Sequence, residues 1–264
     1  MYARKFENTD SFMRFLMGGT LNENFNWNSY RLLSQRSDNK SSTSSYDEAE
    51  NLFRFGDRTN LQKLQETATR LKSHQGETSR QVMYSDMCGF MPNISNYVNG
   101  LPTNMFNLKQ QKFVGGTKIV NIVFNPTVDW GWGVDKIVEV GIKILDCITS
   151  LERQGYRVNL YVLTASTKGS EIIASAVRIK RSDDRINLMK LAYPLVNPSY
   201  FRRHFARFIE NSDVKTDFSG TYGNPQLSKE QVDKVMKSLN LKADYYLTSY
   251  EVHRNGISLK KYLD

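Results

Sequence analysis

The sequence predicts a three-layer α/β fold with a mostly parallel sheet, and three consecutive segments carry this prediction. Residues 118–124 are β-branched and almost continuously apolar, as in a strand that is buried on both faces. Residues 134–154 place apolar side chains three and four positions apart, which indicates a long amphipathic helix that stops before Gly155. Residues 156–163 return to the pattern of a strand. A strand, a helix and a strand in so short a span favour two parallel strands joined by a crossover helix.

The chain beyond this unit predicts one antiparallel strand and further helices. Residues 171–180 alternate in polarity, and the link over residues 166–170 is too short for a crossover, so this strand is expected to be an antiparallel edge strand. Helices are expected at residues 185–192 and 198–210, and at 229–239 behind a capping box of Ser228 and Gln231. Residues 245–252 resemble a last strand.

The N-terminal part predicts short helices and few other features. Helices are expected at residues 11–17, 46–55 and 59–74. We expect them to pack on the sheet, because short helices need a surface to stabilise them. The serine-rich residues 37–45 are interpreted as a mobile surface loop, and residues 89–105 as an extended connection. We therefore expect an N-terminal helical region, residues 1–100, and an α/β domain, residues 101–264, in one compact unit.

The charge of the chain lies mostly in its second part. The net charge is +9, of which residues 1–100 contribute +1 and residues 101–264 contribute +8. Residues 178–207 alone hold eight basic and two acidic side chains, a pattern that indicates a phosphate-binding surface. The predicted nucleic-acid-binding residues are Arg178, Lys180, Arg181, Arg185, Lys190, Arg202, Arg203 and Arg207.

Three of these arginines decide between two interpretations of the basic window. For nucleic-acid binding, Arg202, Arg203 and Arg207 should point to solvent and lie close to the basic residues of the strand at 171–180. Alternatively, they fold back to pair with Asp183, Asp184 or Glu210, or donate to exposed carbonyl groups.

The loop after the first core strand is the second candidate site, because it lies at the carboxyl end of a strand and before a helix. Its candidate residues are Asn125, Thr127, Asp129, Trp130 and Trp132. The loop lacks the glycine pattern of a phosphate or dinucleotide loop, and its neutral oxygens do not suit a divalent ion, so no metal is expected. Alternatively, the two tryptophans simply cover the end of the sheet.

Several classes of protein are not indicated by this sequence. Cys88 and Cys147 form neither a disulfide framework nor a zinc motif, and no serine-nucleophile motif or other catalytic constellation is present. We therefore expect no enzyme activity, no metal and no cofactor. No apolar stretch is long enough to cross a bilayer, and no secretory signal is readable at the N-terminus, so a cytoplasmic protein is expected.

Several motifs together resemble a family of phage- and prophage-encoded proteins of unassigned function. They are residues 45–49 with 55–57, residues 89–94 with Tyr97, residues 100–102 and Met105, residues 155–158, and Asn197 to Arg203. This resemblance implies a viral or prophage context, with a location in the bacterial host cytoplasm or in the virion. The order of elements also resembles von Willebrand factor A-like domains, a Rossmann-like layout, with Asn125 standing where the first metal-binding Asp would be.

These observations leave three function hypotheses. The first is a non-catalytic phage accessory protein that binds nucleic acid through its basic face. The second is a protein-binding module, either a virion component or an inhibitor of a host factor, that uses its aromatic residues and residues 125–133. The third is an enzyme that acts on phosphate esters through the basic window. Fold alone does not decide among them.

Overall fold

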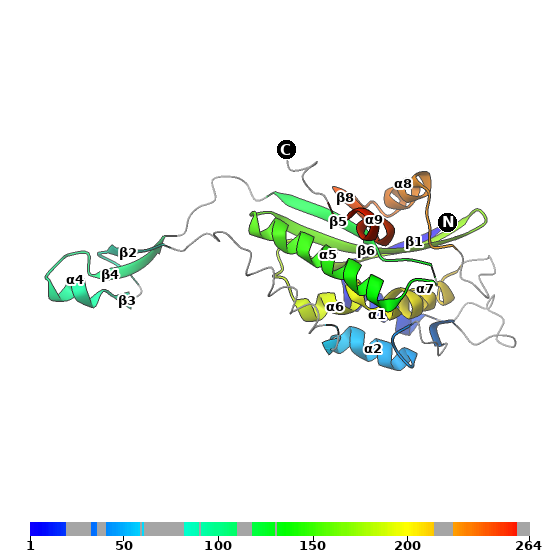
Figure 1. Cartoon of the computed structure of the whole chain (residues 1–264), viewed down its shortest axis with the longest axis horizontal. Coiled ribbons are helices and arrows are strands. Elements are labelled where there is room, and N and C mark those ends of the chain that lie inside the picture. Colours follow the sequence, from blue (N-terminus) through cyan, green and yellow to red (C-terminus); the bar gives the residue numbers. More distant parts are fainter. Residues whose placement is uncertain are drawn as a thin grey trace. The chain divides into compact units, whose positions relative to one another are not determined.

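The structure of the chain, a computed structural model, forms two compact units (Figure 1). It describes residues 1–19, 33–35, 41–58, 60, 82–89, 91–109, 118–129, 131–213 and 224–257. Residues 1–70 and 118–264 form the sheet unit, and residues 71–117 form the small unit. The division differs from the expected boundary near residue 100, because residues 1–70 belong with the sheet.

The sheet unit is built on five strands in the order β1-β7-β6-β5-β8. Their bounds are β1 (Tyr2–Phe6), β5 (Ile119–Asn125), β6 (Arg157–Lys168), β7 (Glu171–Lys180) and β8 (Tyr245–Thr248). Three neighbouring pairs are parallel and only β6 and β7 are antiparallel, which confirms a mixed α/β protein with a mostly parallel sheet. The antiparallel strand β7 is not an edge strand, however, because β1 pairs with its outer side and places Tyr2 opposite Ile173.

Helices cover both faces of this sheet, because its strands are apolar on both sides. Ile122, Leu160 and Ile173 face one core, and their neighbours Val123 and Ala174 face the other. The larger core is completed by α1 (Thr9–Gly18), α2 (Tyr46–Phe55), α5 (Val134–Arg153), α6 (Leu188–Val196), the π-helix η2 (Tyr200–His204), α7 (Phe205–Glu210) and α9 (Ser249–Asn255). The smaller core lies under α8 (Lys229–Ser238), on the opposite side of the sheet from α5 (Figure 1). The N-terminal helices therefore pack on the sheet as expected, and the 3₁₀ turn η1 (Leu33–Gln35) lies near η2 and α7.

Local signals explain where most of these helices begin. Ser228 and Gln231 form the predicted capping box of α8, and Asn8 and Ser11 form another at α1. The strand predicted at residues 245–252 is a strand only as far as Thr248. Thr248 is also the N-cap of α9, and Glu251 completes a capping box with it. The predicted helix at residues 198–210 is divided into η2 and α7.

Part of the predicted surface loop lies in the interior. Ser41 and Thr43 are buried, at 3% and 6% exposed, and Ser45 caps α2. Their expected surface position is therefore wrong, and the physical reason is a buried arginine described below. Residues 36–40 lie outside the described residues, as does almost all of the predicted helix at 59–74.

The small unit has an antiparallel sheet in the order β2-β4-β3. Its elements are β2 (Val82–Asp86), β3 (Met91–Pro92), α4 (Ile94–Val98) and β4 (Met105–Lys109). The expected extended connection at residues 89–105 is therefore wrong. Gly89 permits the close turn between β2 and β3, because a Cβ atom there would lie 2.0 Å from the Phe106 carbonyl oxygen.

Candidate functional site

Two of the eight predicted basic residues, Arg202 and Lys180, lie at opposite ends of α5. Arg202 donates from Nη2 to the carbonyl oxygen of Trp132 at 3.2 Å, just before α5 begins. Lys180 forms an ion pair with Glu152 at 2.5 Å, in the last turn of the same helix. A helix of 20 residues is about 30 Å long. The expectation that Arg202 lies close to Lys180, at the end of β7, is therefore wrong.

Arg203 is a structural residue in the interior of the sheet unit. Its side chain is fully buried, although the basic-face hypothesis required it to point to solvent. The guanidinium group donates to Thr43 Oγ1 at 2.7 Å, to the Thr43 carbonyl at 2.7 Å and to the Ser34 carbonyl at 2.9 Å. Arg203 thus follows the alternative interpretation, in which the arginine satisfies carbonyl groups of another segment.

Glu210 adds a second connection between the same segments. Its carboxylate is buried and accepts from the Ser34 backbone N–H at 3.1 Å and from the Ser34 hydroxyl at 2.6 Å. Arg207 lies 3.6 Å from the same carboxylate, as the alternative interpretation expected. These side chains attach Ser34 and Thr43 to η2 and α7, which leaves few polar atoms of Arg203 and Glu210 for a ligand.

At the other end of α5, Lys180 organises the chain that follows β7. Only 2% of its side chain is exposed. Besides pairing with Glu152, its ammonium group donates to the carbonyl groups of Val158, Arg181 and Asp184 at 3.1–3.2 Å. Lys180 therefore fixes residues 181–184 against the start of β6 and is itself shielded from a large ligand.

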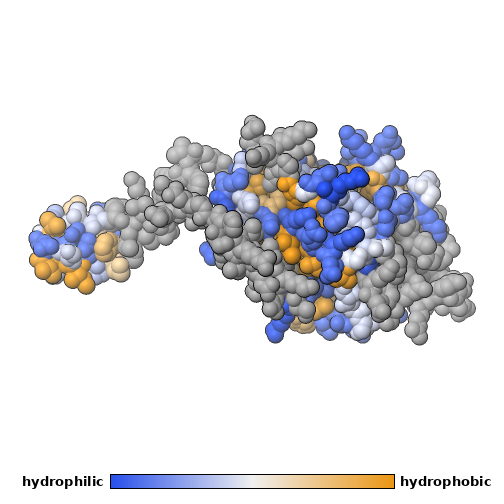
Figure 2. Space-filling model, in the orientation of Figure 1, coloured by the Kyte–Doolittle hydropathy of each residue, from blue (hydrophilic) through white to orange (hydrophobic). Residues whose placement is uncertain are grey.

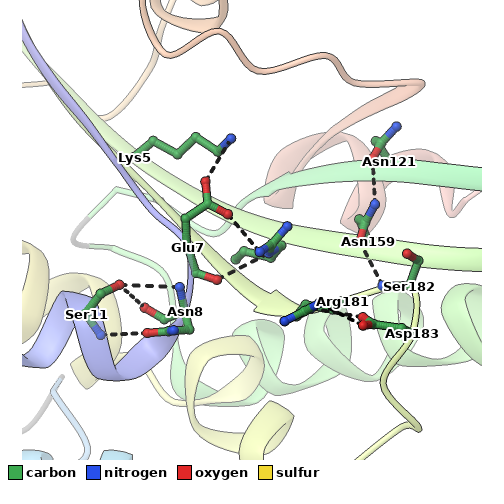
Figure 3. A network of polar contacts seen from close by, with 10 residues as sticks. Lys5, Glu7, Asn8, Ser11, Asn121, Asn159, Arg181, Ser182 and Asp183 are labelled. Carbon is green, nitrogen blue, oxygen red and sulfur yellow. Dashed lines mark hydrogen bonds and ion pairs between the residues drawn. The ribbon is translucent and has the colours of Figure 1, made fainter.

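Two more predicted cations have acidic partners at this end of β7. Arg178 lies 2.7 Å from one carboxylate oxygen of Glu7, and Lys5 lies 3.1 Å from the other. Arg181 makes a bidentate contact with Asp183 at 2.7 and 2.9 Å. Figure 3 shows both carboxylates facing these basic groups beside the chain of Asn121, Asn159 and Ser182. Arg181 and Asp183 remain exposed, so water screens this pair.

The remaining two predicted cations, Arg185 and Lys190, are exposed at the rim of a cavity. The cavity has a volume of about 210 Å³ and is lined by Ile179, Lys180, Asp184, Arg185, Asn187, Lys190 and Leu191; we call it the α6 cavity. Neither Arg185 nor Lys190 has a side-chain hydrogen bond or ion pair with another residue that the structure describes. Asn187 caps α6 here by accepting from the Lys190 backbone N–H at 3.3 Å. The cavity at the start of α6 is thus lined by two cations without a described partner and by one exposed carboxylate, that of Asp184.

Two further exposed cations, Lys118 and Arg157, lie at the same edge of the sheet but were missed by sequence reasoning. They stand at the starts of β5 and β6, where the Arg157 backbone N–H donates to the Lys118 carbonyl at 3.0 Å. A signal for them was available, because the first residues of two adjacent parallel strands share one edge. We call Lys118, Arg157, Arg181, Arg185 and Lys190 the basic edge.

The loop at residues 125–133 satisfies its own polar groups. Asn125 and Thr127 are buried; the Asn125 side chain accepts from the Thr127 backbone at 2.9 Å and donates to the Tyr246 hydroxyl at 3.1 Å. Asp129 accepts from the Tyr250 hydroxyl at 2.5 Å. Burial and this carboxylate raise the pKa of Tyr250, so the hydroxyl keeps the proton that it donates.

The alternative interpretation of this loop, that its tryptophans cover the end of the sheet, holds for Trp132. Trp132 packs edge-on against Tyr250 and His253, with ring centroids 5.0 and 5.2 Å apart. It therefore joins the loop to α9 and covers that end of the sheet. Trp130 lies outside the described residues.

Two kinds of feature are absent from the described part of the chain. No group of three or more His, Cys, Asp or Glu side chains is placed to hold a metal ion within the described part of the chain. Among the same residues, no helix has the length and apolar character needed to span a bilayer.

Comparisons with known proteins assign a family. The family described as "Domain of unknown function (DUF7192)" matches residues 1–262. The chain therefore belongs to this family. No curated protein and no solved structure matched the chain.

Proposed function

We propose that this member of the DUF7192 family binds phosphate groups of a nucleic acid at the basic edge, with the α6 cavity as the central contact. The observation that carries the proposal is the pair Arg185 and Lys190, which are exposed at the cavity rim and lack a described partner. Cations that are already paired must exchange one partner for another on binding, whereas these two need only be desolvated. They would therefore contribute most to phosphate affinity.

The chemistry of the cavity suits a phosphate group. The guanidinium group of Arg185 can contact two phosphate oxygens at once, and Lys190 supplies a mobile point charge. The first backbone N–H groups of α6 point toward the same end. Lys180 and Asp184 shape the wall, and the Glu152 pair offsets the Lys180 charge.

The rest of the basic edge provides the extended contact that a polyanion needs. Lys118, Arg157 and Arg181 are exposed at the same edge, and the whole chain carries a net charge of +9. Attraction of this kind is independent of base sequence and depends strongly on salt. Arg203 has no part in it, because it is buried and its donors are engaged.

The direct test is binding of fluorescently labelled duplex DNA, single-stranded DNA and single-stranded RNA, followed by anisotropy at low salt. The double variant Arg185→Ala/Lys190→Ala should bind about 10-fold or more weakly, as expected when two charged phosphate contacts are lost. The matched control is Lys234→Ala/Lys237→Ala on α8, because it removes two exposed lysines and the same net charge. Equal affinities for wild type and the cavity variant, or equal losses in both variants, would refute the assignment to this edge.

We also propose a phage or prophage origin and a layout related to von Willebrand factor A-like domains, which rest on the sequence resemblances given above. The host cytoplasm and the virion are the locations that this origin implies. Mass spectrometry of purified virions and of infected cells distinguishes them. If the protein is found neither in the virions nor in the infected cells, the proposed phage context is contradicted.

A protein-binding role for residues 125–133 has less support than the basic edge. Asn125 and Thr127 are buried and bonded within the loop, and Trp132 packs against α9. The observation that favours a protein contact lies instead in the small unit.

A further inference from the structure

The described residues of the small unit include several exposed apolar side chains and no buried one. Met87, Met91, Ile94, Tyr97, Val98 and Leu101 are 42–76% exposed. Figure 2 shows hydrophobic residues on the surface of this unit. No side chain described within residues 82–109 is buried. Exposed apolar side chains gathered in one place mark interaction surfaces, whereas single ones are ordinary.

Helix α4 gives this surface its most ordered part. Ile94, Tyr97 and Val98 stand at positions i, i+3 and i+4, so they share one side of the helix. In an isolated globular domain such a stripe faces the core, yet each of these side chains is at least 70% exposed. A unit of this size buries too little surface to be stable alone without a disulfide, a metal or a partner. Cys88 is a free thiol, so a disulfide within the chain does not supply that stability.

The charge distribution indicates which kind of partner fits. Residues 87–108 contain no Asp, Glu, Lys, Arg or His, although 24% of the whole chain is charged. Such a face offers no cation to a nucleic acid or an anionic lipid and no anion to a basic partner. The same uncharged face on a second copy matches it in polarity. Elsewhere two copies, each with a net charge of +9, repel one another.

From these observations we propose that the small unit is a dimerisation module, in which the exposed side of α4 packs against the same surface of a second copy. The contact is isologous, with Ile94, Tyr97 and Val98 at its centre and Met91 and Leu101 around them. The proposal is independent of nucleic-acid binding at the basic edge.

The experiment measures the mass of the full chain in solution by analytical ultracentrifugation over a range of concentrations. Wild type should sediment as a dimer that dissociates on dilution. The variant Ile94→Asp/Val98→Asp should raise the dimer Kd by about 100-fold or more, because four carboxylates would enter an apolar contact. The control Phe55→Asp adds a charge at an equally exposed apolar residue of the sheet unit and should leave the dimer unchanged.

A second measurement labels the native cysteine of the small unit and leaves the proposed interface residues unchanged. Cys88 is exposed and Cys147 is buried, so a thiol-reactive spin label should modify Cys88 selectively. Dipolar coupling between the labels of two copies should be present in wild type and absent after dilution. A wild-type chain that is monomeric at every concentration would overturn the proposal, and so would a monomer that binds vesicles of zwitterionic phosphatidylcholine instead. A dimer that survives the double substitution, or one without coupling between the labels, would do so as well.

Discussion

Arg203 and Thr43, 160 positions apart in the chain, are joined by two hydrogen bonds of 2.7 Å, one to the Thr43 hydroxyl and one to its carbonyl oxygen. The arginine is completely buried, and the serine-rich segment around Thr43 is held against η2 by this contact. The charge pattern predicts that Arg203 binds a nucleic acid. In the structure, Arg203 instead holds the segment around Thr43 in the sheet unit.

The first prediction follows from this contact. Arg203→Ala should lower the free energy of unfolding by about 3–5 kcal/mol, because it leaves buried acceptors without their charged donor. Nucleic-acid binding by the folded fraction should not change. Urea unfolding followed by circular dichroism measures the loss, with Arg185→Ala as the exposed control, expected to stay within about 0.5 kcal/mol of wild type. Equal stability of Arg203→Ala and wild type contradicts the structural role.

The second prediction concerns the contact between α5 and α6. A Cβ atom at Gly141 would lie 2.5 Å from the Leu195 carbonyl oxygen and from a Val196 methyl group. Gly141→Ala should therefore destabilise the protein, although Gly to Ala within a helix normally stabilises by up to about 1 kcal/mol.

Gly18 at the end of α1 provides the matched control for that substitution. A Cβ atom there meets nothing within 4 Å, so Gly18→Ala should leave the melting temperature equal to or above that of wild type. Melting curves of both variants decide the point. A rise in melting temperature for Gly141→Ala would show that α5 and α6 are not so close.

The third prediction is a pH dependence of stability from His204. Complete burial lowers the pKa of His204 to about 3, and the nearby Arg203 charge acts in the same direction. The unfolded chain has the ordinary value near 6.5 and therefore binds the proton first as the pH falls. Stability from this group is complete above about pH 6.5 and declines between pH 6.5 and 3.

The measurement compares wild type with His204→Gln by urea unfolding at pH 7 and pH 5. Wild type should lose roughly 2 kcal/mol more than the variant over this range. The interval lies above the ordinary range of carboxylates, and the other histidines are common to both proteins. Parallel losses in the two proteins would mean that His204 is not buried in its neutral form.

Much of the fold could be predicted because its signals are local. The strands β5 and β7, the helix α5 and the capping box of α8 each carry their pattern within about 20 residues. The capping box of Thr248 and Glu251 was equally local, but the tyrosines before it favoured continuing the strand.

What could not be predicted depends on partners far apart in the sequence. β1 is a strand because Tyr2–Phe6 pairs with residues 173–177, and its own residues show no clear alternation. The burial of Arg203 likewise depends on Ser34 and Thr43, whose small polar side chains resemble those of a solvated loop. Of the eight predicted basic residues, only Arg185 and Lys190 combine exposure with the absence of a described partner, and no local pattern distinguishes them from the others.

The measurement that tests the central claim most directly is the salt dependence of duplex DNA binding. Each phosphate contact contributes about 0.9 to the slope of log K against log salt, so Arg185→Ala/Lys190→Ala should lower the magnitude of the slope by about 1.8 relative to wild type. Lys234→Ala/Lys237→Ala should keep the wild-type slope. An identical slope for wild type and the cavity variant would contradict phosphate binding at Arg185 and Lys190.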